Sequence, residues 1–307
     1  MMLAKTINRI LKQFGVTLVR NGTLEHLIQG QQVAETPYEI LLALNEIKDA
    51  VDSSQKQLLR HQISTKWGIV DLTEQSQTLA NTMSCPLCHY QGESRKFGKF
   101  VANCIFEGGI LIRHQCPECD VIFGPEKMMG ITEASLSRDY EWHYQIFSEG
   151  DSTQQEVRAF HALKPKKNGV YLNWGAGAWS KAIDLLRQQG WNVYGYEPHA
   201  SATGHGPYII SSKEQLLTMQ FDGIFSNNVL EHLRYPVREL SEMRSLLKSG
   251  GKMSHATPCF EYLYEYTRFH LFFFLGRSRS ALADKAGLRI DDYVVDGEFM
   301  NIILTAA

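Results

Sequence analysis

The pattern of hydrophobic and polar positions divides the chain into a helical first part and a second part in which strands alternate with helices. Apolar residues recur at helical spacing in residues 3–14, and a second helix with a broad apolar stripe is expected to begin near Pro37. From residue 169 onward, short apolar runs alternate with amphipathic stretches, which is typical of a parallel sheet covered by helices on both faces. The predicted strands are 169–174, 191–196, 207–210, 221–226, 251–257, 289–295 and 299–304, and the predicted helices are 178–189, 236–248 and 277–286.

Four segments follow from this pattern. They are a helical N-terminal segment (1–80), a compact module that bears cysteines (81–125), a helical connector (126–165) and an α/β domain (166–307). We interpret the helix that begins near Pro37 as packing on the body of its own chain. A dimerisation hairpin, which would make a homodimer, is the alternative.

Composition and charge restrict the class of protein. Hydrophobic residues make up 44% and charged residues 21% of the 307 positions, as in an ordinary globular chain. The net charge of -2 provides no overall attraction to nucleic acid, which we therefore do not expect as a partner. The longest apolar runs, such as residues 271–275, fall far short of the roughly 20 residues that span a bilayer. The first residues do not resemble a signal peptide, so we expect a cytoplasmic location.

Basic residues lie among the apolar positions of the first helix, at Lys5, Arg9, Lys12 and Arg20. A basic amphipathic helix can lie on an anionic membrane surface, so peripheral membrane contact is one interpretation of this segment. Packing on the body or on a second subunit is the other.

Four of the six cysteines form two Cys-x-x-Cys pairs, Cys85 with Cys88 and Cys116 with Cys119, and 27 residues separate the pairs. Two such turns can place four thiolates at the corners of a tetrahedron, which suits structural Zn²⁺. The lack of an export signal favours metal over disulfides. We therefore predict a small zinc-ribbon-like module, and because a closed four-sulfur site has no open coordination position, we assign the metal no chemistry.

A glycine turn follows the first strand of the α/β domain. Gly175 and Gly177 flank Ala176 there, and Glu197 ends the next strand, 20 residues beyond Gly177. Glycines let a nucleotide-type ligand approach the backbone, and an acid at the end of the second strand can accept hydrogen bonds from ribose hydroxyls. Ser180 stands where a dinucleotide fingerprint would have its third glycine, which argues against NAD.

Residues 221–258 resemble the class I S-adenosylmethionine (SAM)-dependent methyltransferases. That family has a buried strand ending in polar residues, a Val-Leu-Glu-His-Leu element, a helix and a Leu-Lys-Pro-Gly-Gly turn. Residues 225–228, 229–233 and 247–251 are similar to these features. The resemblance covers residues 169–307 and implies a Rossmann-like α/β fold with SAM as the cofactor.

Three positions depart from the family pattern. The usual aspartate at the end of the first strand is Asn173, Trp179 replaces the third glycine of the loop, and Ser249 replaces the proline of the later turn. An amide at position 173 can orient the loop but supplies no charge opposite the ammonium of the cofactor. Carried over by position, the resemblance implies that the cofactor-binding residues are Asn173, Gly175, Ala176, Gly177, Glu197, Asn227 and Asn228. For Asn227 and Asn228, capping of the strand is the alternative.

A zinc module ahead of a SAM domain resembles the bacterial sugar C-methyltransferases and related methyltransferases of carbohydrate pathways. This resemblance implies a small-molecule acceptor, a sugar or glycan intermediate. Their tyrosine-rich stretch corresponds to residues 138–144, which implies that Tyr140 and Tyr144 bind the substrate; aromatic packing between domains is the alternative. The family's histidine corresponds to His270. Phe269 stands where the C-methyltransferases have a glutamate, which favours O-methylation over C-methylation.

Methyl transfer requires an aligned acceptor and a group that removes or accommodates a proton. Histidine suits that step, and we take His270 as the first candidate and His232 as the second. Each has a structural alternative, and His232 belongs to the family's Leu-Glu-His-Leu element. The leading hypothesis is a SAM-dependent methyltransferase with a small-molecule acceptor. The alternatives are an RNA methyltransferase whose zinc module binds nucleic acid, and a non-catalytic scaffold with the same fold.

Overall fold

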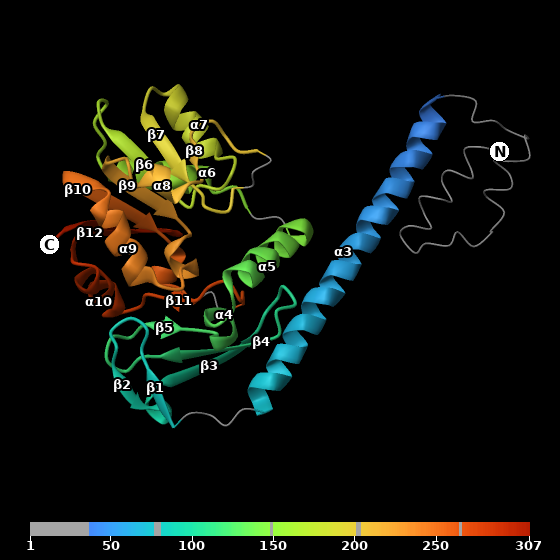
Figure 1. Ribbon diagram of the computed structural model, residues 1–307, viewed down its shortest axis with the longest axis horizontal. Helices are drawn as coiled ribbons and strands as arrows, with labels where there is room; N and C mark the ends of the chain where they lie inside the picture. The colour runs from blue at the N-terminus through green and yellow to red at the C-terminus, as the bar shows by residue number, and fades with distance from the viewer. Residues whose placement is uncertain (1–36, 77–80, 148–149, 201–203, 264–265) are drawn as a thin grey trace, which may run out of the picture. The chain divides into compact units, whose positions relative to one another are not determined.

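The chain divides into two compact units, Met1–Leu58 and Leu59–Ala307. The basic helix predicted near the N-terminus, with the membrane contact inferred from it, lies outside the residues that the structure describes. No helix in the described part is both long enough and apolar enough to cross a membrane. The residues described by the computed structural model, drawn as coloured ribbon in Figure 1, are 37–76, 81–147, 150–200, 204–263 and 266–307.

The first described element is the long helix α3, Pro37–Ser76, which begins at the proline where a helix was predicted. Its large apolar side chains between Leu41 and Leu58 are exposed, whereas Ile63 and Trp67 further along are fully buried. Packing on the body, predicted for the whole helix, is therefore observed for the residues beyond Leu58. The division into units falls inside this helix, and its second half belongs to the core of the larger unit.

The cysteine-bearing part contains two small antiparallel sheets. The first pairs β1 (Thr82–Ser84) with β2 (Gln91–Glu93), and the short 3-10 turn η1 (Ser94–Lys96) follows. The strands of the second sheet are, in spatial order, β11 (Phe272–Phe273), β5 (Ile122–Phe123), β4 (Ile110–Gln115) and β3 (Gly98–Asn103). Because β11 comes from the far end of the chain and pairs with β5, this sheet extends past the boundary predicted at residue 125.

Three helices follow the small sheets: α4 (Glu126–Met129), α5 (Glu133–Ile146) and α6 (Thr153–Ala162). Helices thus occupy much of residues 126–165, the segment predicted to be a helical connector. However, α6 does more than connect two domains. Its Phe160 is fully buried and packs with Tyr171 in the core of the α/β part.

The α/β part is built on a seven-stranded sheet. Its strands are, in spatial order, β12 (Leu288–Asp296), β13 (Phe299–Ala306), β10 (Leu247–Ala256), β9 (Phe221–Asn227), β6 (Val170–Trp174), β7 (Asn192–Tyr196) and β8 (Ile209–Ile210). The strands from β10 to β8 are parallel, but β13 is antiparallel to both of its neighbours. The prediction of a parallel sheet is therefore wrong at this edge. The physical reason is the tight turn at Gly297 (φ +60°), which joins β12 directly to β13 and leaves no room for a crossover helix.

Helices cover both faces of this sheet. The remaining helical elements are α7 (Lys181–Gln188), α8 (Lys213–Leu216), η2 (Leu230–His232), α9 (Pro236–Ser245), η3 (Pro258–Phe260) and α10 (Ser278–Lys285). Tyr171 and Phe225 pack in one core cluster with residues of α6 and α7. Leu172 and Ile224 point to the opposite face and belong to one core cluster with residues of α10 and of α9, the helix drawn in front of the sheet in Figure 1. The Rossmann-like α/β fold predicted from the sequence is thereby confirmed.

Candidate functional site

The glycine turn lies between β6 and α7, at the carboxyl ends of the parallel strands. The N–H groups of Gly175 and Ala176 donate to the carbonyl of Tyr196, at 2.9 and 3.2 Å. Gly175 and Gly177 both have a φ of +72°, a conformation that favours glycine. A Cβ on Gly175 would lie 2.7 Å from Cγ2 of Val229, so the space at this position also requires glycine.

Glu197 follows the end of β7 and faces the glycine turn. Its carboxylate accepts a hydrogen bond from the N–H of Gly177 at 3.2 Å and another from the N–H of His199 at 3.0 Å. The two features that predicted a nucleotide-type cofactor therefore lie next to each other. A half-buried carboxylate beside a glycine turn is a chemical environment that suits ribose hydroxyls.

Asn173 is buried in the last part of β6, and its side chain is committed to a neighbour. Its Nδ2 donates to Oε2 of Glu156 at 2.7 Å, and Glu156 belongs to α6. Burial is the main cause that raises the pKa of Glu156. The sequence did not single out Glu156, because an acid in an amphipathic helix carries no motif that distinguishes it from a solvent-facing residue.

Asn227 and Asn228 lie where β9 ends, at the same edge of the sheet. Nδ2 of Asn227 is buried and has no hydrogen-bond partner within the described ranges. Asn228 has a φ of +53°, and its N–H donates to the carbonyl of Ala256 at 2.8 Å. The backbone of Asn228 therefore closes the strand, whereas the amide of Asn227 has an unused donor.

Tyr140, His232 and His270, which were predicted separately for substrate binding and catalysis, lie close together in the structure. The hydroxyl of Tyr140 lies 3.3 Å from Nδ1 of His232, and the rings of His232 and His270 are 5.0 Å apart. Tyr140 also stacks on Phe269, with ring centroids 4.3 Å apart. A carboxylate oxygen of Glu231 and one ring nitrogen from each histidine lie within 4.8 Å of one another. This group of side chains is the candidate acid–base centre.

Burial determines the charge state of this centre. It lowers the pKa of His232 to about 4, so that this ring is neutral at pH 7 and can accept a hydrogen bond at Nδ1 from Tyr140. It also raises the pKa of Glu231 to about 7. Oε1 of Glu231 accepts from the hydroxyl of Thr257 at 2.6 Å, and its Oε2 has no partner in the described part of the chain. The sequence analysis did not predict Glu231 as a site residue, although it lies inside the Leu-Glu-His-Leu element of residues 230–233.

The backbone of His270 is held by a residue of the cysteine-bearing part. Arg113 on β4 is buried, and its guanidinium donates to the carbonyl of His270 at 2.9 and 3.2 Å and to that of Thr267 at 2.6 Å. On the other side, Nδ1 of His270 lies 3.7 Å from Sγ of Cys259. The small sheet therefore positions the first candidate for catalysis. Nothing in the pattern of the sequence indicates this connection.

Tyr144, the second predicted substrate-binding residue, lies one helical turn beyond Tyr140 on α5. Its ring stacks against that of Tyr140 with centroids 6.1 Å apart, and 55% of the residue is exposed. Tyr144 is therefore a largely exposed neighbour of Tyr140.

The four predicted metal ligands are also brought together. Sγ of Cys85 lies 3.8 Å from Sγ of Cys119, and the sulfurs of Cys88 and Cys116 are 3.6 Å apart. All four sulfurs lie within 4.8 Å of one another. A tetrahedral site with zinc–sulfur bonds of about 2.3 Å has sulfur–sulfur edges of about 3.8 Å, so this arrangement fits Zn²⁺.

The two cysteine turns have the same backbone geometry. The N–H of Cys85 and that of Cys116 each donate to the carbonyl five residues later, at 2.8 and 2.9 Å. The residue after the second cysteine has a positive φ in both turns, 66° at His89 and 67° at Asp120. Two matching turns that face each other are what a shared four-sulfur site requires.

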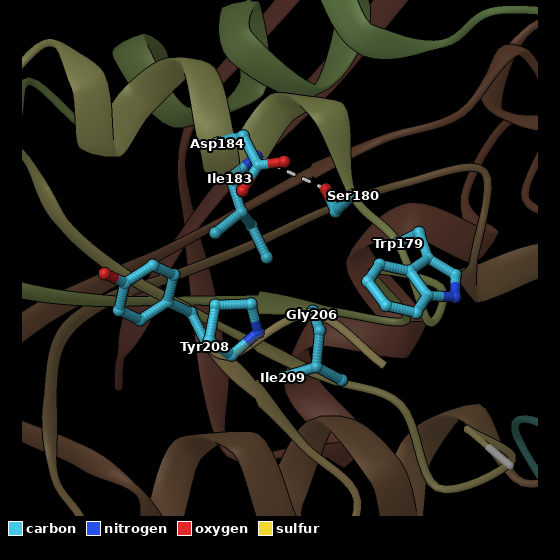
Figure 2. Close-up of a pocket in the computed structure, with 8 residues that line it drawn as sticks. Trp179, Ser180, Ile183, Asp184, Gly206, Tyr208 and Ile209 are labelled. Carbon is cyan, nitrogen blue, oxygen red and sulfur yellow. Dashed lines mark hydrogen bonds between the residues drawn. The ribbon is translucent and has the colours of Figure 1, made fainter. Parts of the chain in front are cut away.

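A small cavity lies beside the start of α7. Figure 2 shows Trp179 and Tyr208 at its opposite ends, with Ile183 and Ile209 between them. Its volume is about 70 Å³, room for a few waters but well below the roughly 300 Å³ of a small-molecule site. We therefore do not assign a cofactor or a substrate to it.

The α/β part of the chain is similar to a known family. Residues 146–294, slightly less than half of the chain, match the family model described as a methyltransferase domain. No curated protein matched the chain.

Similar solved structures include CalO1, a methyltransferase in calicheamicin biosynthesis, with 15% identity, 57% of this chain and 59% of that chain covered, and a TM-score of 0.41. The mitomycin 7-O-methyltransferase MmcR has 15% identity, with 58% and 61% covered and a TM-score of 0.44. The 1,6-didemethyltoxoflavin-N1-methyltransferase of Burkholderia thailandensis has 14% identity, with 63% and 94% covered and a TM-score of 0.44. The chain thus spans about three fifths of the length of the first two proteins.

Proposed function

We propose that the chain, whose residues 146–294 form a SAM-dependent methyltransferase domain, transfers a methyl group from SAM to a hydroxyl of a small molecule, and that this acceptor is a sugar or a glycan intermediate. The observation that carries the proposal is the contact between the Tyr140 hydroxyl and Nδ1 of His232, beside the ring of His270, where the parallel strands end. Phe269 stacks on Tyr140 where a second acid would assist carbon deprotonation, and this supports O-methylation.

The cofactor would be held at the glycine turn and at the ends of the neighbouring strands. The backbone of Gly175, Ala176 and Gly177 leaves room for a close approach, Glu197 accepts ribose hydroxyls, and Asn227 offers its free amide donor. When bound, SAM supplies an electrophilic methyl group on a positively charged sulfur.

The acid–base centre performs the other half of the reaction. In the proposal His270 removes the proton from the acceptor hydroxyl, and its position is fixed by the bonds from Arg113 to its carbonyl. Tyr140 aligns the acceptor, and the neutral His232 fixes the orientation of the Tyr140 hydroxyl. Tyr144, which is exposed beside Tyr140, contacts the part of the acceptor that does not react.

We also assign a structural metal to the cysteine cluster. Cys85, Cys88, Cys116 and Cys119 hold a structural Zn²⁺, since their sulfurs have the spacing of a tetrahedral site. The metal has no chemical role. It stabilises the small sheet whose β4 and β5 contact the segment that bears His270.

The test is a methyl-transfer assay in which the purified chain is incubated with SAM and, separately, with nucleotide-activated sugars, free oligosaccharides and RNA. Mass spectrometry should find one added methyl group on a sugar hydroxyl, and His270→Ala should remove it. Tyr208→Phe, which changes a tyrosine of the small cavity, is the matched control and should keep the activity. Methylation of RNA alone, or the absence of SAM binding at millimolar ligand, would overturn the proposal.

A further inference from the structure

One carboxylate touches both ends of the glycine turn. Oε2 of Glu156 accepts from Nδ2 of Asn173, two residues before the turn, at 2.7 Å. The same oxygen lies 3.5 Å from the hydroxyl of Ser180, the residue that caps α7 after the turn. Oε1 accepts from the hydroxyl of Ser152 at 2.8 Å. Glu156 is therefore held in place at the base of the loop that is proposed to bind the cofactor.

The charge of this carboxylate is not compensated by a cation in the described part of the chain. Its hydrogen-bond partners are a side-chain amide and two hydroxyls, and no ion pair to Glu156 exists within the described residues. The nearby cations on α6 and α7 have other partners, since Arg158 pairs with Asp296 at 2.6 Å and Lys181 with Asp151 at 3.3 Å. Burial accordingly raises the pKa of Glu156. A cation that arrives with a ligand would stabilise the charged form.

We infer that Glu156 binds the ammonium group of the methionine part of SAM. This inference rests on the proposed function. Glu197 lies beside Gly177 and is assigned to the ribose, so the methionine part is assigned to the opposite side of the turn, where Asn173 and Glu156 meet. Asn173 is neutral, and its amide holds the carboxylate that carries the charge. The negative charge missing from position 173 is therefore supplied by the neighbouring helix.

The experiment measures binding, not turnover, by isothermal titration calorimetry of the full chain. The ligands are SAM, S-adenosylhomocysteine and 5'-methylthioadenosine, the last of which lacks the part that carries the ammonium. Glu156→Gln removes the charge but keeps the size and one acceptor oxygen, which can still accept from Asn173, while its NH2 group can donate to the hydroxyl of Ser152. It should weaken SAM and S-adenosylhomocysteine by roughly tenfold to a hundredfold, the range for a hydrogen bond to a charged group, and leave 5'-methylthioadenosine within about twofold.

A second variant distinguishes loss of the negative charge from a change in the shape of the loop. Glu156→Gln combined with Asn173→Asp moves the carboxylate across the same 2.7 Å hydrogen bond, and it should restore SAM affinity to within a few-fold of the original. Thermal denaturation of each variant checks that it is folded. Asp151→Asn, an exposed acid near the start of the same helix, is the matched control and should change no affinity.

The possible results are distinct. Equal weakening of all three ligands by Glu156→Gln would mean that the residue only shapes the loop, and this would overturn the inference. Unchanged SAM affinity, or a double variant that stays as weak as the single one, would overturn it as well. If the unaltered chain binds neither SAM nor 5'-methylthioadenosine, the proposed function itself fails, and the inference fails with it.

Discussion

The carboxylate of Asp139 and the guanidinium of Arg268 form an ion pair from which water is excluded. Nε of Arg268 lies 2.5 Å from Oδ2 of Asp139, and neither side chain has any exposed surface. The other carboxylate oxygen accepts from Nζ of Lys66 at 3.0 Å and from Nε1 of Trp67 at 3.2 Å. One acid therefore connects α3 and α5 to the segment that leads to His270.

Breaking this pair should be strongly destabilising. Asp139→Asn leaves the buried guanidinium of Arg268 without its counter-charge, and removal of one partner of a buried pair costs about 3–5 kcal/mol of unfolding free energy. Urea denaturation followed by circular dichroism measures the change. Asp151→Asn, which alters an exposed pair with Lys181, should cost less than about 1 kcal/mol. Similar losses of unfolding free energy in the two variants would contradict the assignment of Asp139 and Arg268 as a stabilising buried pair.

Removal of the proposed metal should affect more than the small sheets. The purified chain should contain about one zinc per molecule, and Cys116→Ser should lose it, because a tetrahedral structural site needs all four ligands. The midpoint of thermal unfolding should then fall by on the order of 10 °C. Methyl transfer should fall too, since β5 and β4 contact the segment that bears His270.

Cysteine outside the cluster provides the control for this experiment. Cys104→Ala should retain the metal, because Cys104 is not one of the four clustered sulfurs. Equal zinc contents in the Cys116 and Cys104 variants, measured by inductively coupled plasma mass spectrometry, would rule out the four-sulfur site.

Tyr140 and His232 should act as one unit. Each of Tyr140→Phe and His232→Phe removes the same hydrogen bond and should lower kcat/KM by roughly tenfold to a hundredfold. Because the two residues act through one contact, the double variant should be little worse than the more damaged single variant. The measurement is a double-mutant cycle on kcat/KM with the best acceptor. Losses that multiply would show that the two side chains work independently.

Buried histidines should make the protein sensitive to acid. Burial lowers the pKa of His143 and His232 to about 4 and that of His255 to about 3, whereas an unfolded histidine titrates near 6.5. Between pH 6.5 and about 4 the unfolded chain therefore binds more protons than the folded one, and the free energy of unfolding falls as the pH falls. Glu231 opposes this trend, because its pKa is raised to about 7, and burial raises the pKa of Glu74 and Glu156 in the same direction, so the three histidines set the trend only where their larger shifts outweigh these carboxyl groups.

The contribution of one histidine can be measured directly. His255 is fully buried and its Nδ1 lies 2.8 Å from the hydroxyl of Ser226, a contact that glutamine can replace. His255→Gln should therefore narrow the stability difference between pH 7 and pH 5 by about 1–2 kcal/mol, as urea denaturation at both pH values would show. The exposed His205→Gln should leave that difference unchanged. A variant at position 255 that loses as much stability in acid as the original chain would contradict the assignment.

Most strands and helices of the α/β part could be predicted, because each strand is an apolar run and the apolar residues of each helix recur at helical spacing. Sequence motifs also predicted the glycine turn, Glu197 and the cysteine turns, because the residues of each motif lie close together in the sequence. The direction of β13 was missed, although the three residues between the last two predicted strands are too few for the crossover that a parallel pair needs. Glu156 stayed hidden because its importance comes from what it faces, not from its neighbours in sequence.

Contacts between distant parts of the chain were also beyond prediction. The Asp139–Arg268 pair joins positions that share no motif, and a two-residue strand such as β11 has no periodicity to detect. The meeting of Tyr140 with His232 was not predicted either, although each residue was named as a candidate. Long-range pairing depends on the whole fold, whereas a sequence pattern reports only local order.

The pairing of β11 with β5 has a consequence for protein engineering and for the way such a chain could have evolved. A cysteine module that is complete in sequence could be deleted, transplanted or gained as a cassette. Here an excised segment of residues 81–125 would leave its sheet without Phe272 and Phe273, and the remainder would expose the two phenylalanines that are now buried. Neither fragment contains all strands of the sheet, so gain or loss of the module requires substitutions near residue 272 as well.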